Sequence, residues 1–417
     1  MALSTPRPEV LSPAGSPEKL RAAVAYGADA VYLAGTSFGM RAGAGNFTPG
    51  QMAEGIALAH EAGVKVYVTC NIIPREGEMR LLPEFLAQTE ALGADAFIVS
   101  DLGVLAACKK YAPRAAVHIS TQAGVLNSET ARAFYDLGAS RVVLARETSL
   151  AEVAQLCARL PAGLEAEVFC HGAMCVSFSG RCVISDYLTG RGANHGECAQ
   201  PCRWRYALME EKRPGEYMPV AEDENGTYLY NSRDMCILDH VPELLQAGVR
   251  SLKIEGRTKS AYYTAAVTAA YRHAVDAALA GEPLAESWRQ EVYKVSHRPY
   301  STGFYYGAPG QYTADACYFS DYDVIALVEG SAGDGLTRLS QRNRFFPGEE
   351  AELLMPGRES VCFTLGALYA ADGAPLESAP HPRMEVLTRL PAEPPAGSFV
   401  RRRRRESLSG HAAGRGE

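Results

Sequence analysis

The 417-residue sequence contains no apolar run of the ~18 residues that a membrane-spanning helix requires. Its first residues, MALSTPRPEV, have neither the cationic start nor the apolar stretch of a secretory signal peptide. These features predict a cytoplasmic protein with no membrane partner. In a reducing compartment, clustered cysteines are more typical of metal binding or redox chemistry than of disulfide bonds.

Several motifs that identify hydrolases and nucleotide-binding proteins are also absent. There is no Gly-x-Ser-x-Gly nucleophile elbow and no His-Glu-x-x-His zinc helix, so a peptidase would depend on a dyad of Cys170 and His171. The glycine-rich loop that holds Arg41 and Asn46 is not followed by Gly-Lys-Ser/Thr, which excludes a phosphate-binding P-loop. The C-x3-C-x2-C spacing of radical enzymes that use S-adenosylmethionine is missing as well.

Negative charge predominates, since 48 Asp and Glu residues against 41 Lys and Arg residues give a net charge of −7. This charge argues against nucleic-acid binding through bulk electrostatics. Residues 401–417 depart from the balance, because they include six arginines and two glutamates. We expect them to form a basic, disordered tail that either keeps the protein soluble or contacts backbone phosphates.

One pattern recurs over the first 260 residues: an amphipathic helix ends at a glycine, and a short apolar strand follows closely. The copies are YGADAVYLAG from Tyr26, AGVKVYVTC from Ala62, LGADAFIVSD from Leu92, LGASRVVLAR from Leu137 and AGVRSLKIEG from Ala247. With EVLSPAG, AAVHIST and LEAEVF they provide eight strand candidates. Apolar strands that alternate with helices are typical of a parallel sheet buried on both faces. We therefore predict an α/β fold, a (β/α)8 TIM-type barrel in residues 1–282.

The pattern changes at two places. At about residues 170–236 the strand rhythm is interrupted, which we interpret as an insertion at the C-terminal end of the seventh strand, the face where barrel enzymes place their sites. After the barrel we predict a linker in residues 283–299. In residues 300–400 short apolar runs alternate with Gly and Pro turns, which predicts a small antiparallel β-domain.

The insertion contains six of the eleven cysteines: Cys170, Cys175, Cys182, Cys198, Cys202 and Cys236. Four thiolates can hold Zn²⁺ or an iron–sulfur cluster, since both accept tetrahedral sulfur ligation. Structural zinc sites usually contain close C-x2-4-C pairs. The close pairs here, Cys170/Cys175 and Cys198/Cys202, are not the usual two-residue knuckle, so the spacing leaves both metals open.

Charged residues near the ends of predicted strands are further site candidates. Lys253 and Glu255 lie two apart on the same side of a strand, with Arg257 just beyond, and an internal ion pair is the competing explanation. His171, at the end of the seventh strand, is a candidate general acid or base. Four residues are candidates for substrate binding: Arg41, Asn46, Arg181 and Arg203. Arginine supplies forked donors for both phosphate and carboxylate groups.

The segment EVFCHGAMCVSFSGRCVISDYLTGRGANHGECAQPCRW, from Glu167 to Trp204, resembles the signature of the collagenase-like peptidase family, the thirty-second of unassigned mechanism. VLSPAGSPEKLRAAVAYGADAVYLAG, MRAGAGNFT, YLYNSRDMC, SLKIEGRTKS and SHRPYSTGF extend the resemblance over the chain. QRNRFFPGEEAELLMPG, from Gln341, is similar to the C-terminal domain of members that hydroxylate tRNA uridine. Despite its name, the family includes RNA and ubiquinone hydroxylation proteins.

The resemblance implies oxygen-independent 5-hydroxylation of wobble uridine in tRNA, with prephenate as co-substrate. It also implies a 4Fe–4S cluster on the cysteines of HGAMC, SGRC, GEC and RDMC, which are Cys175, Cys182, Cys198 and Cys236. Cys202 and Cys170 are the alternative ligands. An electron donor or an iron–sulfur carrier would be a further partner. Two other hypotheses stay open: a peptidase, as the family name states, and a zinc-stabilised RNA-binding or scaffold protein.

Overall fold

The computed structural model describes residues 7–40, 46–175, 182–193, 197–204, 207–209, 217–219, 233–310 and 318–404. The chain divides into two compact units between Phe319 and Ser320. Within the described ranges, no helix is both long and apolar enough to cross a membrane.

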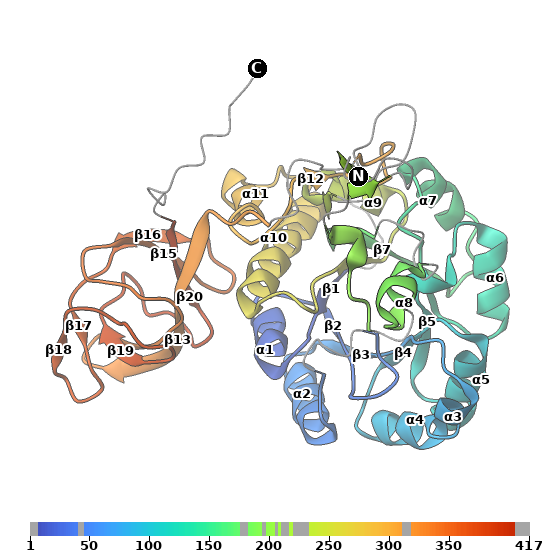
Figure 1. Ribbon diagram of the computed structural model, residues 1–417, viewed down its shortest axis with the longest axis horizontal. Coiled ribbons are helices and arrows are strands. Elements are labelled where there is room, and N and C mark those ends of the chain that lie inside the picture. Colours follow the sequence, from blue (N-terminus) through green and yellow to red (C-terminus); the bar gives the residue numbers. More distant parts are fainter. Residues whose placement is uncertain are drawn as a thin grey trace. The chain divides into compact units, whose positions relative to one another are not determined.

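The first unit is a closed barrel, as the sequence predicts (Figure 1). In the described part of the chain its eight parallel strands are β1 (Glu9–Pro13), β2 (Ala30–Leu33), β3 (Lys65–Cys70), β4 (Ala96–Val99), β5 (Ala116–Ile119), β6 (Arg141–Val143), β7 (Glu165–Ala173) and β11 (Ser251–Ile254). The barrel closes because β11 pairs in parallel with both β1 and β7. All the strand candidates that the sequence offered are present.

Helices surround the strands in Figure 1. They are α1 (Pro17–Ala25), α2 (Pro49–Glu61), α3 (Glu76–Met79), α4 (Leu82–Ala91), α5 (Leu102–Tyr111), α6 (Ser128–Asp136), α7 (Leu150–Cys157), α9 (Val241–Gln246), α10 (Ala261–Ala280) and α11 (Glu286–Glu291). The recurring glycine after a helix has a positive φ in each copy, at Gly27, Gly63, Gly93, Gly138 and Gly248. Glycine adopts this conformation without the steric cost of a Cβ, which explains why the helix-to-strand pattern could be read from the sequence.

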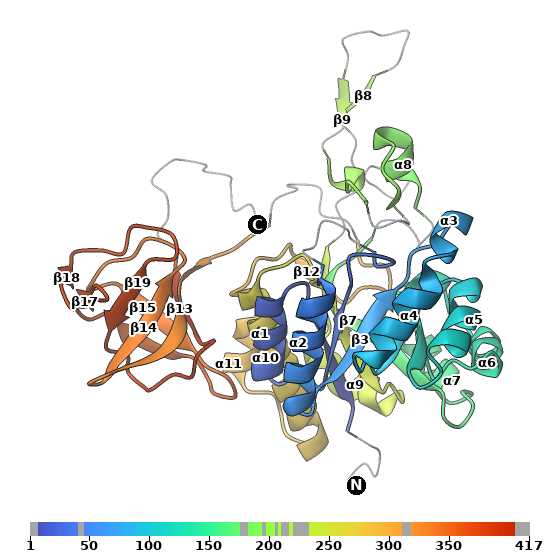
Figure 2. The same cartoon turned by 90° about the horizontal axis from the view of Figure 1, so that it is seen from below.

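The cysteine-rich segment follows β7, as predicted. Its described elements are α8 (Ile184–Thr189), the 3₁₀ turn η3 (Pro201–Arg203), the hairpin strands β8 (Ala207–Met209) and β9 (Tyr217–Pro219), and β10 (Asp234–Cys236). β10 returns antiparallel to the end of β7 and also pairs with β12 (Tyr300–Ser301). Figure 2 shows α8 at the end of the barrel where α3 lies.

The second unit is an antiparallel sheet in the order β16-β15-β20-β13-β14-β19-β17-β18. Its strands are β13 (Tyr322–Gly333), β14 (Leu336–Gln341), β15 (Glu350–Leu354), β16 (Val361–Thr364), β17 (Leu368–Tyr369), β18 (Pro375–Leu376), β19 (Glu385–Thr388) and β20 (Phe399–Arg403). The sheet encloses its own core, in which Ile325, Leu339, Phe345 and Val400 are fully buried. The predicted antiparallel β-fold is confirmed.

The structure corrects two details of the expected domain plan. β12 pairs with β10 and belongs to the first unit, so the β-domain begins after Phe319 and not at Tyr300. The expected disordered tail is wrong for Arg401–Arg403, which lie in β20. Arg401 is fully buried and donates from Nη2 to the Glu352 carboxylate at 2.6 Å. A run of arginines resembles a solvated tail in sequence, whereas its first member is paired inside a sheet.

Candidate functional site

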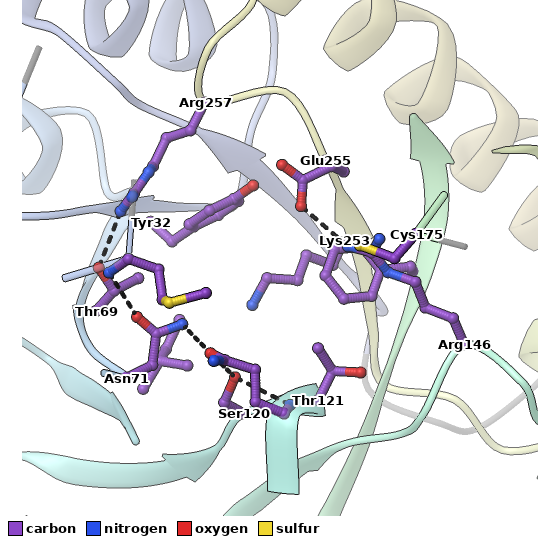
Figure 3. A pocket seen from close by; sticks show the side chains of 14 residues that line it. Tyr32, Thr69, Asn71, Ser120, Thr121, Arg146, Cys175, Lys253, Glu255 and Arg257 are labelled. Atoms are coloured by element: carbon purple, nitrogen blue, oxygen red, sulfur yellow. Dashed lines mark hydrogen bonds and ion pairs between the residues drawn. The ribbon is translucent and has the colours of Figure 1, made fainter. Parts of the chain in front are cut away.

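A cavity of about 130 Å³ opens among the C-terminal ends of the barrel strands (Figure 3). Asn71 directly follows β3, Ser120 follows β5, and Arg146 lies in the loop after β6. β11 contributes Lys253, and Glu255 comes directly after it. The cavity therefore lies at the face of the barrel where residues after different strands converge, as in barrel enzymes generally.

Lys253 is both a member of an internal ion pair and a residue of the cavity lining, the two roles that the sequence left open. Its Nζ donates to Oε1 of the fully buried Glu167 at 2.8 Å, which confirms an internal ion pair. The same side chain lines the cavity, with Nζ 4.7 Å from the ring centroid of Tyr32. Burial alone opposes ionisation of Glu167, but Lys253 and Arg141 outweigh it and lower the pKa of this carboxyl.

Next to this pair, an ionic network crosses the barrel interior. Arg141 on β6 donates from Nη1 to Glu9 Oε1 at 2.6 Å and to Glu167 Oε2 at 3.2 Å. The Tyr67 hydroxyl donates to Glu9 Oε2 at 2.6 Å, and burial raises the pKa of Tyr67 well above its ordinary value. Arg141 also reaches Glu165 at 2.6 Å. These contacts compensate the charges that lie between the strands.

Glu255 and Arg257, both predicted from the sequence, also line the cavity. Oε2 of Glu255 accepts a hydrogen bond from Arg146 Nη2 at 3.0 Å, and Arg257 Nη1 donates to the Thr69 hydroxyl at 2.9 Å. The Arg146 guanidinium carbon lies 3.9 Å from the centroid of the Phe169 ring. Arg146 was missed in the sequence, although it follows the apolar run LGASRVVLA and so lies at a predicted strand end.

The opposite wall of the cavity is a chain of polar groups. The backbone N–H of Met40 donates to Asn71 Oδ1 at 3.1 Å, and Asn71 Nδ2 donates to Gln122 Oε1 at 2.8 Å. The Ser120 hydroxyl donates to the same Gln122 oxygen at 3.3 Å. Gln122 Nε2 and Arg146 Nε are buried and have no hydrogen-bond partner within the described structure. Neither Asn71 nor Gln122 was selected from the sequence.

His171 is not brought to the cavity. The register between β7 and β11 shifts so that Phe169 lies opposite Lys253 and His171 lies opposite Ile254. This irregularity turns His171 towards α10 and β12. The hydroxyl of Tyr271 on α10 is 3.4 Å from Nδ1, and the hydroxyl of Tyr300 on β12 is 3.3 Å from Nε2. Burial, reinforced by nearby positive charge, lowers the pKa of His171 to about 3. The proposed acid–base role at the mouth of the barrel is therefore not supported by its position.

The Cys170–His171 dyad has unfavourable chemistry as well. The Cys170 thiol is fully buried and donates to the backbone oxygen of Lys253 at 3.4 Å. Burial raises the pKa of this thiol well above its ordinary value. Because the thiolate is the nucleophile, a buried thiol with a raised pKa is poorly suited to attack a peptide bond.

The four candidate metal ligands lie within the cysteine-rich segment. Cys175 is exposed and lines the cavity, so the structure brings it together with Lys253, Glu255 and Arg257. Cys182 precedes α8, and the exposed Cys198 accepts a hydrogen bond from the backbone N–H of Gln200 at 3.4 Å. Cys236 ends β10, where burial raises the pKa of its thiol to about 11.

Free thiols suit a soft metal centre, and all the described cysteines are free. The geometry is a separate matter: no three His, Cys, Asp or Glu side chains within the described ranges lie close enough to share one ion. The chemistry of the donor set thus fits an iron–sulfur cluster or zinc, whereas the positions of the described side chains do not form a coordination shell.

Four residues were predicted from the sequence to bind substrate: Arg41, Asn46, Arg181 and Arg203. Arg41 and Arg181 fall outside the described residues, as does the side chain of Arg203 in η3. Asn46 is partly buried and is not among the residues that line the cavity. The proposed roles of all four residues stay predictions.

The chain is similar to known proteins over most of its length. The family model of Peptidase family U32 matches residues 15–315, and that of the Peptidase family U32 C-terminal domain matches residues 320–401. A relative from Bacillus subtilis, named tRNA hydroxylation protein P1, is 36% identical over 393 residues, which cover 93% of this chain and 92% of the relative.

Two other relatives carry different names. A 23S rRNA 5-hydroxycytidine synthase from Escherichia coli is 37% identical over 277 residues, which cover 66% of this chain and 40% of that protein. A protein from Porphyromonas gingivalis named collagenase is 30% identical over 312 residues, which cover 72% of this chain and 73% of that protein. The names of the relatives therefore include both RNA hydroxylation and proteolysis.

Proposed function

Since the chain belongs to Peptidase family U32, we propose that it acts in the oxygen-independent 5-hydroxylation of wobble uridine in tRNA. A relative that aligns with almost the whole chain is named for tRNA hydroxylation, and another is named for hydroxylation at position 5 of a pyrimidine in rRNA. The observation that carries the proposal is the cavity at the barrel mouth. There Cys175, a candidate cluster ligand, meets Lys253, Glu255 and Arg257.

In this proposal prephenate binds in the cavity. Among the described lining residues, Arg146, Lys253 and Arg257 are cationic and Glu255 is the carboxylate that opposes them. Prephenate has two carboxylates, and arginine binds such groups through its forked donors. Lys253 is held by Glu167, which orients its ammonium group for an anionic ligand.

A 4Fe–4S cluster belongs to the same proposal. Cys175, Cys182, Cys198 and Cys236 would hold it, and when bound it would supply an electron-transfer or Lewis-acidic centre. An electron donor or an iron–sulfur carrier is then an expected partner. The free thiols and the position of Cys175 support this assignment, and zinc is the competing outcome of a metal analysis.

The proposal is tested by nucleoside analysis of tRNA. Cells that lack this protein should lose 5-hydroxyuridine and its derivatives, and the wild-type chain should restore them without oxygen, provided that the cells make prephenate. Protein purified without oxygen should be brown and contain about four irons per chain. Unchanged 5-hydroxyuridine in the deletion strain would refute the function, whereas colourless protein with one zinc would refute only the cluster.

A peptidase is the second candidate, because one relative is named collagenase and the family is named for peptidases. The buried Cys170 thiol and the placement of His171 argue against the dyad that such an enzyme would need here. Cleavage of fluorescent collagen peptides by purified protein, abolished by Cys170→Ser, would favour this candidate. We expect no cleavage above the background of the variant.

A further inference from the structure

We propose that Asn71 fixes Gln122 as a hydrogen-bond donor, so that the cavity selects an acceptor-rich carboxylate ligand and not the imide edge of uridine. This inference rests on the proposed function, and it assigns the cavity to the co-substrate. Asn71 would act through Gln122 as a positioning residue, and Gln122 would determine specificity.

The orientation of the Asn71 and Gln122 side-chain amides follows from one backbone group. The N–H of Met40 can only donate, so the Asn71 atom that faces it at 3.1 Å must be the oxygen. The Asn71 amide nitrogen then points to Gln122, and the atom that it meets at 2.8 Å must be the Gln122 oxygen. A side-chain amide is usually oriented by its hydrogen-bond network, and here an unambiguous donor begins that network.

The acceptor capacity of Gln122 is fully used. Its oxygen has two lone pairs, and these accept hydrogen bonds from Asn71 Nδ2 and from the Ser120 hydroxyl. What remains is the Nε2 donor, which is buried and has no acceptor within the described structure. A buried donor without an acceptor costs free energy, so a ligand oxygen that reaches it gains affinity.

A second residue of the cavity lining, Arg146, also has an unmet donor. Arg146 donates from its terminal nitrogens to Glu255 and to the backbone oxygen of Ala173, but its Nε is buried and has no acceptor among the residues that the structure describes. Lys253 and Arg257 add positive charge to the same lining. Unmet donors and cationic side chains together favour a ligand that has several acceptor oxygens and a negative charge.

The imide edge of uridine has a different requirement. It presents two carbonyl acceptors on either side of an N–H donor, and a glutamine reads it by accepting from that N–H while donating to a carbonyl. Gln122 cannot accept, because Asn71 and Ser120 occupy its oxygen. We therefore expect the uracil base to be recognised outside this wall, by a different part of the protein.

Two substitutions test the inference by complementary routes. Gln122→Met keeps the length of the side chain and removes the donor without adding charge. Asn71→Ala leaves Gln122 in place and frees its amide to turn. Asn127→Ala is the matched control, because Asn127 also accepts a backbone hydrogen bond, at 2.8 Å from Thr130 N, but caps α6 and does not line the cavity.

The measurement is equilibrium binding of prephenate and of uridine 5′-monophosphate to the full-length protein, purified without oxygen. We expect both cavity variants to weaken prephenate binding by about tenfold or more, because an unmet buried donor strongly favours the ligand that satisfies it. The double variant should bind no more weakly than Gln122→Met, since Asn71 acts through Gln122. Asn127→Ala should bind prephenate like the wild type.

The outcomes separate this inference from the proposed function. Prephenate binding within twofold of wild type in Gln122→Met, additive losses in the double variant, or weaker binding of the nucleotide in Gln122→Met would each overturn the inference. Failure of the wild type to bind prephenate would overturn it as well. Loss of 5-hydroxyuridine in the deletion strain is a separate observation, which decides the proposed function whatever the binding results are.

Discussion

Two neighbouring regions of the barrel treat buried polar groups in opposite ways. In the interior network, Arg141 reaches Glu9, Glu165 and Glu167, and its charge is compensated on several sides. In the lining of the cavity at the mouth, Gln122 and Arg146 each have a buried donor with no acceptor in the described part of the chain. The first arrangement is what stability requires, and the second leaves hydrogen bonds for a ligand to make.

Lys253 takes part in both regions. Its ammonium group belongs to the network through Glu167 and to the cavity through its position in the lining. Changes to the network should therefore affect the free energy of unfolding, whereas changes to the cavity wall should affect binding. Loss of binding from a change in the network, or loss of stability from a change in the cavity wall, would contradict this distinction.

The largest expected effect concerns the cysteine-rich segment beside the cavity. Cys182→Ala should abolish iron binding and 5-hydroxyuridine formation, because it removes one of the four proposed cluster ligands. Iron and sulfide content and tRNA nucleoside analysis are the measurements. Cys362→Ala, an exposed cysteine on β16 of the second unit, is the matched control and should change neither. Retained 5-hydroxyuridine in Cys182→Ala would show that the reaction does not depend on a cluster held by this residue.

The next largest effect is on stability, in the interior network. Glu167→Leu should lower the free energy of unfolding by about 3–5 kcal/mol, because it leaves Lys253 and Arg141 without their shared buried carboxylate. Urea denaturation measures this change. Glu165→Gln is the control, since the Glu165 side chain is 46% exposed and should contribute about 1 kcal/mol or less. Equal losses in the two variants would contradict the distinction between network and surface.

A smaller effect is expected for Arg257, on binding. Arg257→Met should weaken prephenate binding by about 10- to 100-fold, because it removes the proposed charge-assisted contact to a carboxylate of the ligand. Its effect on the melting temperature should be smaller than that of Glu167→Leu, and scanning calorimetry provides that comparison. Arg114→Met, at an arginine whose side chain is 75% exposed, should leave binding unchanged. Unaltered prephenate affinity in Arg257→Met would remove this residue from the proposed site.

The barrel could be predicted from the sequence because its signals are local. A glycine that ends each helix and an apolar run that follows it are both set by backbone geometry and burial. The boundary of the second unit was harder to predict from the sequence, because the pairing of Tyr300–Ser301 with β10 joins segments far apart in the chain. The burial of Arg401 by Glu352 depends on a strand pairing of the same non-local kind.

In the site, too, features with a local sequence signal could be predicted and features that depend on non-local contacts could not. Lys253 and Glu255 were identified because alternation along a strand predicts a shared side. His171 was misplaced because an irregularity between Lys253 and Ile254 breaks that alternation on β7, and a register shift has no reliable sequence signal. Asn71 and Gln122 were missed because a polar residue after a strand looks like any loop residue. Only the three-dimensional structure shows that these two share a hydrogen bond.

The smallest expected effect is on the pH dependence of stability, which the interior network should influence through Glu167. The pKa of Glu167 lies below its ordinary value of 4.5 in the folded protein, because Lys253 and Arg141 outweigh the effect of burial. Its ionised form therefore contributes stability that is present above the unfolded pKa and is lost as the pH falls through the lower folded pKa. Glu167→Gln should flatten the acid limb of the stability curve relative to the wild type. Unfolding free energies measured by urea titration from neutral pH down to the acid limb provide the check. A curve as steep in the variant as in the wild type would assign the acid sensitivity to other carboxylates.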